Sequence, residues 1–389
     1  MCSAYPGPAD RDRIVGDDLR EHQMNAELVP SEDERALAET VRDVLTDLSP
    51  IAQVRADFDS EAGYAATAWK ALAGDVGLCG LLVPEQHGGL GLSWSAANVV
   101  HHELGRSLYP GPFLATSLAT TALLAAGAEA AVPAVAAGET VATVALADRR
   151  GNWTGEGVTA TESGGAWRLT GRRWHVIAGS AADLVVVLAR TPAGDALFVV
   201  EPGAAGRTSA PMTGMDLTRR LATLDLAETP ATLLGEPGGA APLLEVVGRH
   251  LRLALAAEAA GGLDWCAGTC VEYAKTRQQF GRIIGSYQAV AHACVELYGA
   301  ARSAHAAARW AAVAAENGAR EADLASHVAA LRAGEDYRVQ TEAGVHLLGG
   351  IGFTWEHDMH LYYRRARAAG TLAGGAAAHR LAVAGLAGL

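Results

Sequence analysis

The amino-acid sequence predicts an α+β fold in which two helical domains flank a β domain, and three patterns carry this prediction. Apolar residues recur at helical spacing over residues 31–139, short β-prone runs alternate with turns over 140–237, and long alanine-rich stretches fill 238–389. A chain of 389 residues also exceeds what one hydrophobic core usually accommodates, so several packed units are expected. Residues 1–30 fit none of these patterns, and we expect them to form a disordered extension.

Composition and charge limit the class of protein. Half of the residues are hydrophobic and 19% are charged, which is typical of a globular protein. The formal net charge of −12 argues against a nucleic-acid partner, because such a partner requires a basic surface. We find no apolar run long enough to span a membrane and no apolar secretory signal. The five cysteines show no metal-ligand spacing, so we expect reduced thiols and a cytoplasmic location.

The first domain opens with a signal for the start of a helix. Ser31 and Glu34 have the spacing of a capping box, in which each side chain accepts a hydrogen bond from the backbone of the other residue. Apolar residues then recur at helical spacing from Ala36 to Leu45. Two turn-forming strings, PEQHGGLG at 84–91 and YPGP at 109–112, divide the rest of the domain into helices.

The middle domain is predicted from six β-prone runs separated by glycine or polar turns. These runs are Val141–Ala147, Gly157–Thr161, Trp167–Thr170, Leu184–Arg190, Ala196–Glu201 and Arg220–Leu226. Several short strands at this spacing form a small sheet or barrel.

The last domain is predicted to consist of long helices. Alanine favours helix and lets helices approach closely, and the alanine-rich stretches are Pro242–Lys275, Ser286–Glu316 and Ala319–Leu347. Cys266 and Cys270 share one face of the first of these helices, where core packing is a better explanation than redox chemistry.

Two strings in the last domain contain residues suited to a phosphorylated ligand. In residues 273–290, YAKTRQQFGRIIGSYQAV, a glycine-bounded turn carries two arginines, whose planar guanidinium groups suit a diphosphate. A solvated helix corner is the alternative. In residues 347–362, LLGGIGFTWEHDMHLY, glycines allow a large ligand to approach the backbone, or simply end a helix. His357, Asp358 and His360 in this string gain no further ligand at useful spacing, so we expect no metal site.

These two strings resemble the C-terminal domain of acyl-CoA dehydrogenases, particularly bacterial members with a GGIGFTWEHD-type segment. Residues 84–91 and the string ELGR at 103–106 resemble the N-terminal domain of that family, and RRLA at 219–222 resembles its approach to the C-terminal domain. The resemblance covers about residues 32–386, with the motifs in the family order. It implies a helical N-terminal bundle, a β middle domain and a C-terminal four-helix bundle.

The resemblance also implies a cofactor and an assembly. The family removes a proton from Cα and a hydride from Cβ of an acyl thioester, and FAD receives the hydride. The positions that match FAD-binding residues, often completing a neighbouring subunit's site, are Arg277, Phe280, Gln288, Gly349, Gly350 and Gly352. The expected partners are an acyl-CoA or acyl-carrier thioester and either a second copy, as a dimer or tetramer, or a related subunit in a hetero-oligomer.

The sequence departs from the family at the catalytic base. One usual glutamate position is occupied by Ala369, and the other, immediately before Arg252, is occupied by Leu251. The resemblance places Arg252 in substrate binding, and the backbone N–H of Ala369 remains able to polarise the thioester carbonyl. Glu258 follows Leu251 two helical turns later on the same face. Apolar neighbours are expected to raise the pKa of Glu258 and suit it to act as the base; the alternative is an ion pair with Arg252 or with an arginine from another helix.

The middle domain departs as well. Counting from Gly171 places His175 and Ile177 where a stacking tryptophan and a flavin-contacting threonine often occur in the family, while Trp174 is one residue out of register. The leading hypothesis is an FAD-dependent acyl-thioester dehydrogenase that uses Glu258. The alternatives are a non-catalytic or half-site subunit of a heteromeric acyl-CoA dehydrogenase, and a flavin monooxygenase or oxidase on the same fold.

Overall fold

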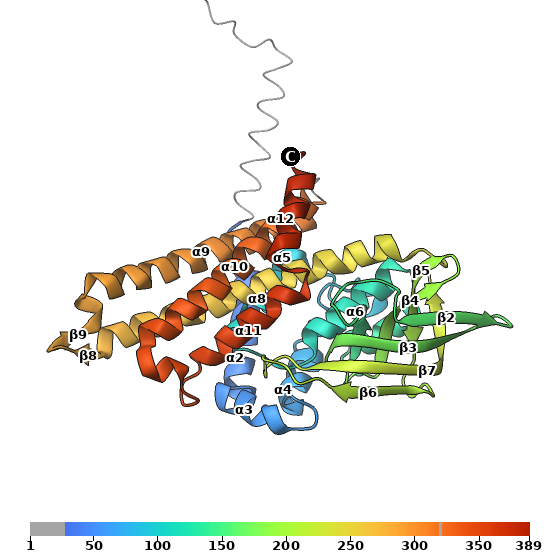
Figure 1. The fold of residues 1–389 in the computed structure, drawn as a ribbon, viewed down its shortest axis with the longest axis horizontal. Helices are drawn as coiled ribbons and strands as arrows, with labels where there is room; N and C mark the ends of the chain where they lie inside the picture. Colours follow the sequence, from blue (N-terminus) through green and yellow to red (C-terminus); the bar gives the residue numbers. More distant parts are fainter. Residues whose placement is uncertain (1–27, 319–320) are drawn as a thin grey trace, which may run out of the picture.

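The computed structural model describes residues 28–318 and 321–389, so most of the predicted N-terminal extension lies outside the described residues. Figure 1 shows long helices at one end of the molecule, a β domain at the other, and shorter N-terminal helices between and below them. This arrangement confirms the predicted α+β fold. In the described residues, no helix is both long and apolar enough to cross a membrane.

The N-terminal domain is helical, and its first helix starts as the sequence predicts. The helices are α2 (Glu32–Leu48), α3 (Ile51–Ala56), α4 (Ala66–Lys70), α5 (Trp94–Arg106), α6 (Phe113–Ala125) and α7 (Val132–Ala136). The capping box is present, because the Ser31 N–H donates to Glu34 Oε2 at 2.7 Å and the Glu34 N–H donates to Ser31 Oγ at 3.1 Å. Val41 and Leu45 on α2 are buried, which is the reason for the apolar spacing in that segment.

The middle domain is a seven-stranded sheet with the hydrogen-bonded path β1-β4-β2-β3-β7-β5 and with β6 paired to β7. Pairing of β4 with β5 closes the path into a small barrel. The strands are β1 (Ala142–Ala145), β2 (Val158–Ser163), β3 (Ala166–Ile177), β4 (Leu184–Thr191), β5 (Gly194–Val200), β6 (Arg207–Pro211) and β7 (Leu221–Leu234). The sequence prediction shortened β3 and β7 and missed β6, whose residues are mostly exposed and lack an apolar alternation.

The C-terminal domain consists of antiparallel helices joined by short turns. The helices are α8 (Ala240–Thr276), α9 (Gln288–Glu316), α10 (Ala322–Leu348), α11 (Met359–Leu372) and α12 (Gly375–Leu386), and the hairpin of β8 (Gln278–Gln279) and β9 (Arg282–Ile283) joins α8 to α9. Buried alanines dominate the contacts among α8, α9 and α10. Cys266 and Cys270 are buried in this core, which confirms their expected packing role. Helix α8 also packs against α5 and α6, and so ties the two helical domains together.

Glycines make the contact between α5 and α8 possible. A Cβ on Gly261 of α8 would overlap the backbone carbonyl of His102, and a Cβ on Gly105 of α5 would overlap the backbone of Glu258. The two helix backbones therefore touch directly.

Replacing Gly261 with alanine is expected to lower the free energy of unfolding by about 1–3 kcal/mol, because the methyl group forces the two backbones apart. Gly268 on the same helix provides the control, since a Cβ added there would meet no atom within 4 Å. Gly268→Ala should raise the free energy of unfolding by about 0.5–1 kcal/mol through helix propensity. Urea titration of both variants measures the difference, and equal effects would contradict the close approach.

Candidate active site

A cavity of about 810 Å³ lies where the sheet meets the helical domains. The end of β3 contributes His175 and Ile177, α8 contributes Leu251, and α11 contributes Ala368 and Thr371. A volume of this size is within the range of cavities that enclose small organic ligands and cofactors. This cavity is therefore the candidate active site, and it contains both residues that were predicted to contact the flavin from the middle domain.

The two usual positions of the base adjoin this cavity, and both are apolar. Leu251 lines the cavity from α8, and Ala368 lines it from α11 one residue before Ala369. Ala369 lines a separate cavity bounded by α8, α10, α11 and α12. An alkyl side chain cannot accept a proton, so neither position supplies a base.

Glu258 is buried beside a much smaller space. Among the described residues that line the large cavity, Glu258 is absent. It borders a cavity of about 30 Å³, which is room for about one water molecule. Arg219 lines both cavities, and its guanidinium group donates a hydrogen bond to Glu258.

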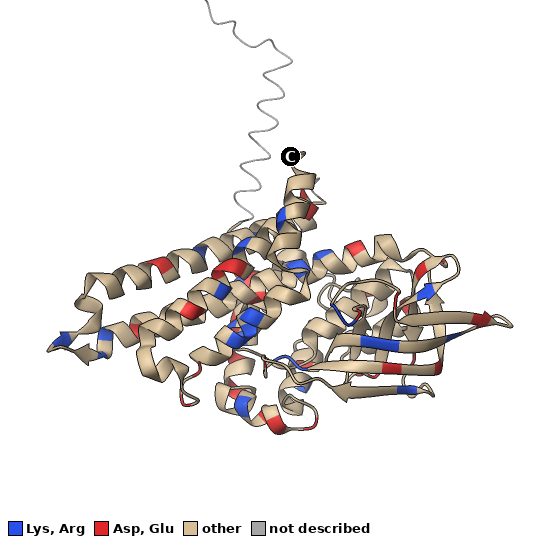
Figure 2. Cartoon of the chain, viewed as in Figure 1, with Lys and Arg blue, Asp and Glu red and all other residues tan. Residues whose placement is uncertain are grey.

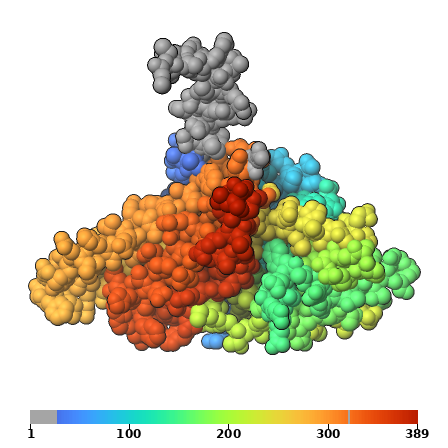
Figure 3. Space-filling model, turned by 45° about the horizontal axis from the view of Figure 1, so that its top comes forward, coloured from blue at the N-terminus to red at the C-terminus, as the bar shows by residue number. Residues whose placement is uncertain are grey.

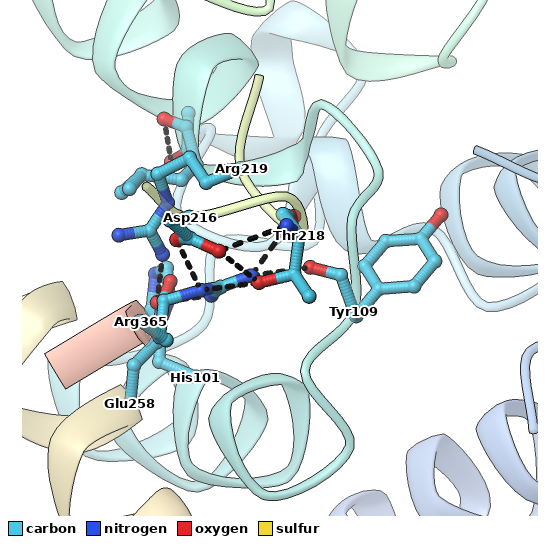
Figure 4. Close-up of polar contacts among 9 residues, drawn as sticks. His101, Tyr109, Asp216, Thr218, Arg219, Glu258 and Arg365 are labelled. Carbon is cyan, nitrogen blue, oxygen red and sulfur yellow. Dashed lines mark hydrogen bonds and ion pairs between the residues drawn. The ribbon is translucent and has the colours of Figure 1, made fainter. Parts of the chain in front are cut away.

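An ion-pair network holds the Glu258 carboxylate from three sides (Figure 4). One oxygen accepts hydrogen bonds from Arg219 and from Arg365 Nη1, the latter at 3.3 Å, and the other oxygen lies 3.6 Å from His101 Nδ1. Arg365 Nε also lies 2.9 Å from Asp216 Oδ2. These residues come from α5, α8, α11 and the segment before β7, so the network joins all three domains.

The charges around Glu258 decide its protonation state. Burial alone raises the pKa of the Glu258 carboxyl, but the positive charge of Arg219, the adjacent His101 and the charge of Arg365 outweigh burial and lower the pKa to about 2. The expected rise in the pKa of Glu258 is therefore wrong, because arginines surround a group that the sequence suggested was flanked only by apolar residues. A base role for Glu258 stays a prediction, while the geometry favours the ion-paired alternative with arginines other than Arg252.

This shift predicts how stability depends on pH. A carboxyl whose pKa is lower in the folded than in the unfolded state stabilises the fold above the unfolded pKa, here about 4.5, and loses that contribution as the pH falls toward 2. The wild-type protein should lose more stability between pH 5 and pH 3 than the Glu258→Gln variant does. Urea titrations across that window measure the difference. Parallel acid profiles for the two proteins would show that Glu258 has no depressed pKa.

Two further predicted contacts with the substrate do not fit this conformation. Ala369 lies in α11 beyond its first turn, where a backbone N–H donates to the carbonyl four residues earlier, so it is not available to a thioester. Arg252 points toward α10, where its Nε donates to Ser326 Oγ at 2.9 Å and its Nη2 lies 3.6 Å from Asp323 Oδ1. In the described chain, Arg252 is not part of the lining of the large cavity.

The arginine-bearing turn in residues 273–290, which was predicted to bind a diphosphate, is exposed at the far end of the long helices. Arg277 caps α8, and Phe280 at the tip of the β8–β9 hairpin is 93% exposed with a positive φ of 53°. Gln288 begins α9. Arg282 in the same hairpin stacks on Tyr287, with its Cζ 3.8 Å from the ring centroid. Basic residues are visible at this end in Figure 2.

The predicted glycine loop lies at the same end of the helical domain. Helices α8 and α10 run in parallel because α9 returns between them, so Thr276 and Leu348 end on the same side (Figure 1). Gly349, Gly350 and Gly352 form the short 3-10 turn after α10, next to Phe353, which is 83% exposed. Figures 1 and 3 show that this end and the β domain are opposite extremes of the molecule. Within one chain, the arginine-bearing turn and the glycine loop are therefore distant from His175 and Ile177.

Metal ligands were not expected at His357, Asp358 and His360, and the first two residues have partners within the protein. Asp358 binds Arg55 at 2.7 Å, and His357 Nδ1 accepts the N–H of Met359 at 3.0 Å. A different group, His102, Asp264 and His305, places possible ligand atoms within 4.8 Å of one another. Both oxygens of the Asp264 carboxylate in that group already have partners, one in Arg302 and the other in His102.

Sequence reasoning missed the arginines that organise the site. Arg219 and Arg220 were recognised only as part of a family-like string, without a role. Arg220 donates to the backbone carbonyls of Asp57 and Phe58 at 2.9 and 2.7 Å, and so fixes an N-terminal loop at the cavity. Glu258 itself was the sequence feature that could have predicted these arginines, because a carboxylate in an apolar helix face requires a cation nearby.

Comparison with known proteins identifies the class. The family model of the acyl-CoA dehydrogenase N-terminal domain matches residues 31–139, and that of the acyl-CoA dehydrogenase C-terminal domain matches residues 248–386. The chain belongs to the acyl-CoA dehydrogenase family, a family of oxidoreductases.

Among its relatives, acyl-CoA dehydrogenase IpdE2 of Mycobacterium tuberculosis is 35% identical over 89% of this chain and 94% of its own length. A solved variant of the Tcur3481–Tcur3483 steroid ACAD superposes with a TM-score of 0.82 at 31% identity, over 92% of this chain and 98% of that one. The ChsE4–ChsE5 complex from Mycobacterium tuberculosis contains a chain that superposes with a TM-score of 0.84 at 26% identity, over 93% of this chain and 98% of that one.

Proposed function

We propose that this chain is a subunit of an FAD-dependent acyl-thioester dehydrogenase in which a second, related chain supplies the proton-abstracting carboxylate. The reaction converts an acyl-CoA or acyl-carrier thioester to the α,β-unsaturated thioester. The observation that carries the proposal is that both usual base positions, Leu251 and Ala369, are apolar, while two arginines hold the neighbouring Glu258 ionised. A carboxylate with a pKa of about 2 is a poor base near neutral pH.

The arrangement of the cofactor residues supports an assembly. FAD is elongated, and the groups suited to its two ends are far apart in this chain: His175 and Ile177 line the cavity where the sheet meets the helical domains, whereas the β8–β9 hairpin and the glycine loop lie at the far end of the long helices. His175 and Ile177 would lie beside the flavin ring in this chain's own cavity, whereas Arg277, Gln288 and the glycine loop would hold the diphosphate and adenosine portion of FAD in a neighbouring chain. The similarity to the ChsE4–ChsE5 complex and to the Tcur3481–Tcur3483 steroid ACAD supports a heteromer, and the latter supports a bulky polycyclic acyl group.

The residues of this chain have binding and positioning roles in the proposal. When bound, FAD supplies the acceptor for the hydride that leaves Cβ. Arg277 and the backbone N–H groups of the glycine loop would bind the phosphates, Arg277 supplying a positive charge and the N–H groups hydrogen bonds. Glu258 fixes Arg219 at the boundary of the large cavity, and the apolar residues Leu251 and Ala368 keep that part of the cavity free of water.

Co-expression with a related chain that carries a base glutamate tests this proposal. The proposal predicts a stable complex with bound FAD that reduces an artificial electron acceptor with acyl thioesters. Replacing the partner's base glutamate with glutamine should abolish turnover, whereas Glu258→Gln in this chain should retain measurable turnover in the complex that remains folded. Loss of turnover specifically with Glu258→Gln, in complex that remains folded, would instead support catalysis by Glu258.

A further inference from the structure

A second cavity of about 350 Å³ lies on the other side of α6 from the candidate active site. It is bounded by α5, α6, α8 and the short turn Leu78–Gly80, and most of its lining is apolar, including Leu81, Phe113 and Leu124. Among the described residues, it shares no lining residue with the large cavity. Val246 at its edge is 37% exposed, so the cavity has an opening to solvent.

Two buried histidines face this apolar space. His101 is 2% exposed and His250 is 1% exposed, and both line the cavity. The Nδ1 atom of His250 lies 2.7 Å from Thr121 Oγ1, and Nδ1 of His101 lies 3.6 Å from the Glu258 carboxylate. Within the described residues, the Nε2 atom of each imidazole has no hydrogen-bond partner. Trp94 packs edge-on against His250, with ring centroids 4.9 Å apart, and so fixes its orientation.

A buried polar atom without a partner is costly, typically by about 1–3 kcal/mol, so two such atoms in one cavity indicate a missing binding partner. Burial and the neighbouring His101 lower the pKa of His250 to about 3, which keeps that imidazole neutral at physiological pH. A neutral imidazole offers a hydrogen-bond donor or acceptor but no charge, so it does not favour a carboxylate. A hydroxyl group both donates and accepts, and therefore suits either tautomer.

We propose that this cavity is a second ligand site, for an uncharged, mostly apolar alcohol whose hydroxyl group binds the Nε2 atoms of His250 and His101. The apolar walls bury the hydrocarbon part, and its volume is at the lower end of the range for small-molecule sites. The site is separate from the cavity in which we place the flavin and thioester, so it does not depend on the proposed dehydrogenase reaction.

Calorimetric titration of the full-length protein with 2-decalol, a bicyclic alcohol, tests the proposal. Decalin-2-carboxylate serves as the charged probe on the same carbon skeleton. The Ala125→Trp variant fills the second cavity from the end of α6, and the His250→Phe variant removes the hydrogen bond while preserving a ring of similar size. The Ala368→Phe variant fills the large cavity instead and is the matched control. Circular dichroism verifies the fold of each variant.

The proposal predicts saturable binding of 2-decalol that is lost in Ala125→Trp, is about tenfold weaker in His250→Phe and is unchanged in Ala368→Phe. The carboxylate should bind at least about tenfold more weakly than the alcohol. Absence of 2-decalol binding to the wild-type protein would mean that water alone satisfies the two histidines, which overturns the proposal. Binding that is lost in Ala368→Phe but not in Ala125→Trp would also overturn it, because the ligand would then occupy the large cavity.

Discussion

Replacing Glu258 with glutamine is expected to lower the free energy of unfolding by about 3–5 kcal/mol, the usual effect of breaking a buried ion pair. The carboxylate is 7% exposed and faces both Arg219 and Arg365. Glutamine keeps the shape but removes the charge, so two buried guanidinium groups lose one of their counter-ions. Because Glu258 on α8 contacts Arg219 of the middle domain and His101 of the N-terminal domain, the loss should weaken the packing between domains as well as α8 itself.

Urea unfolding followed by tryptophan fluorescence and circular dichroism measures this effect. Glu342→Gln is the matched control, because Glu342 also pairs with an arginine, Arg367, at 3.0 Å, but its side chain is 61% exposed. An exposed pair contributes about 0–1 kcal/mol, so the control should unfold almost as the wild-type protein does. Similar small losses for both variants would show that the network around Glu258 has no special structural role.

Replacing Arg277 with alanine is expected to weaken FAD binding by the assembled complex about 100-fold. A charge-assisted, bidentate contact with a phosphate is among the strongest that a side chain makes, and removing one partner of such a contact typically costs about 2–5 kcal/mol. The side chain is exposed at the end of α8. Alanine at this position should therefore change cofactor binding and leave the fold of the free chain intact.

The control for Arg277 lies in the same hairpin. Arg282→Ala removes the same charge, but the Arg282 guanidinium is already stacked on Tyr287 within the chain. We expect this variant to retain most of its FAD. Equilibrium dialysis of FAD against the two purified complexes gives the ratio of their dissociation constants. If both variants lose FAD affinity equally, Arg277 contributes only general electrostatic attraction and makes no specific contact.

The sequence predicts much of the fold because local patterns determine it. The prediction placed α9 at Ser286–Glu316, and the helix spans Gln288–Glu316, since alanine-rich periodicity and the preceding glycine turn define both ends. Helix α11 was not predicted. Its segment follows a glycine loop and is rich in charged residues, and its apolar face becomes visible only when Met359 and Tyr362 are seen buried against α8 and α10.

The site was only partly predictable, because its decisive contacts join residues far apart in the chain. Arg219 and Arg365 are separated from Glu258 by 39 and 107 residues, so no local pattern reveals that they surround the carboxylate. The sequence does correctly show that Leu251 and Ala369 cannot act as bases, because that conclusion depends only on residue type. Whether an acid is a base or a structural ion depends on its neighbours, and these come from three domains.

Anaerobic flavin reduction by the chain on its own is the most direct test of the central claim, that this chain lacks a proton-abstracting base. The purified protein, reconstituted with FAD without any partner, is mixed with a panel of straight-chain, branched and polycyclic acyl-CoA thioesters, and the flavin absorbance is followed. We predict that the absorbance stays unchanged with every thioester, and that bleaching begins when the base-bearing partner is added. Rapid bleaching by the chain alone, abolished by Glu258→Gln in folded protein, would contradict this account.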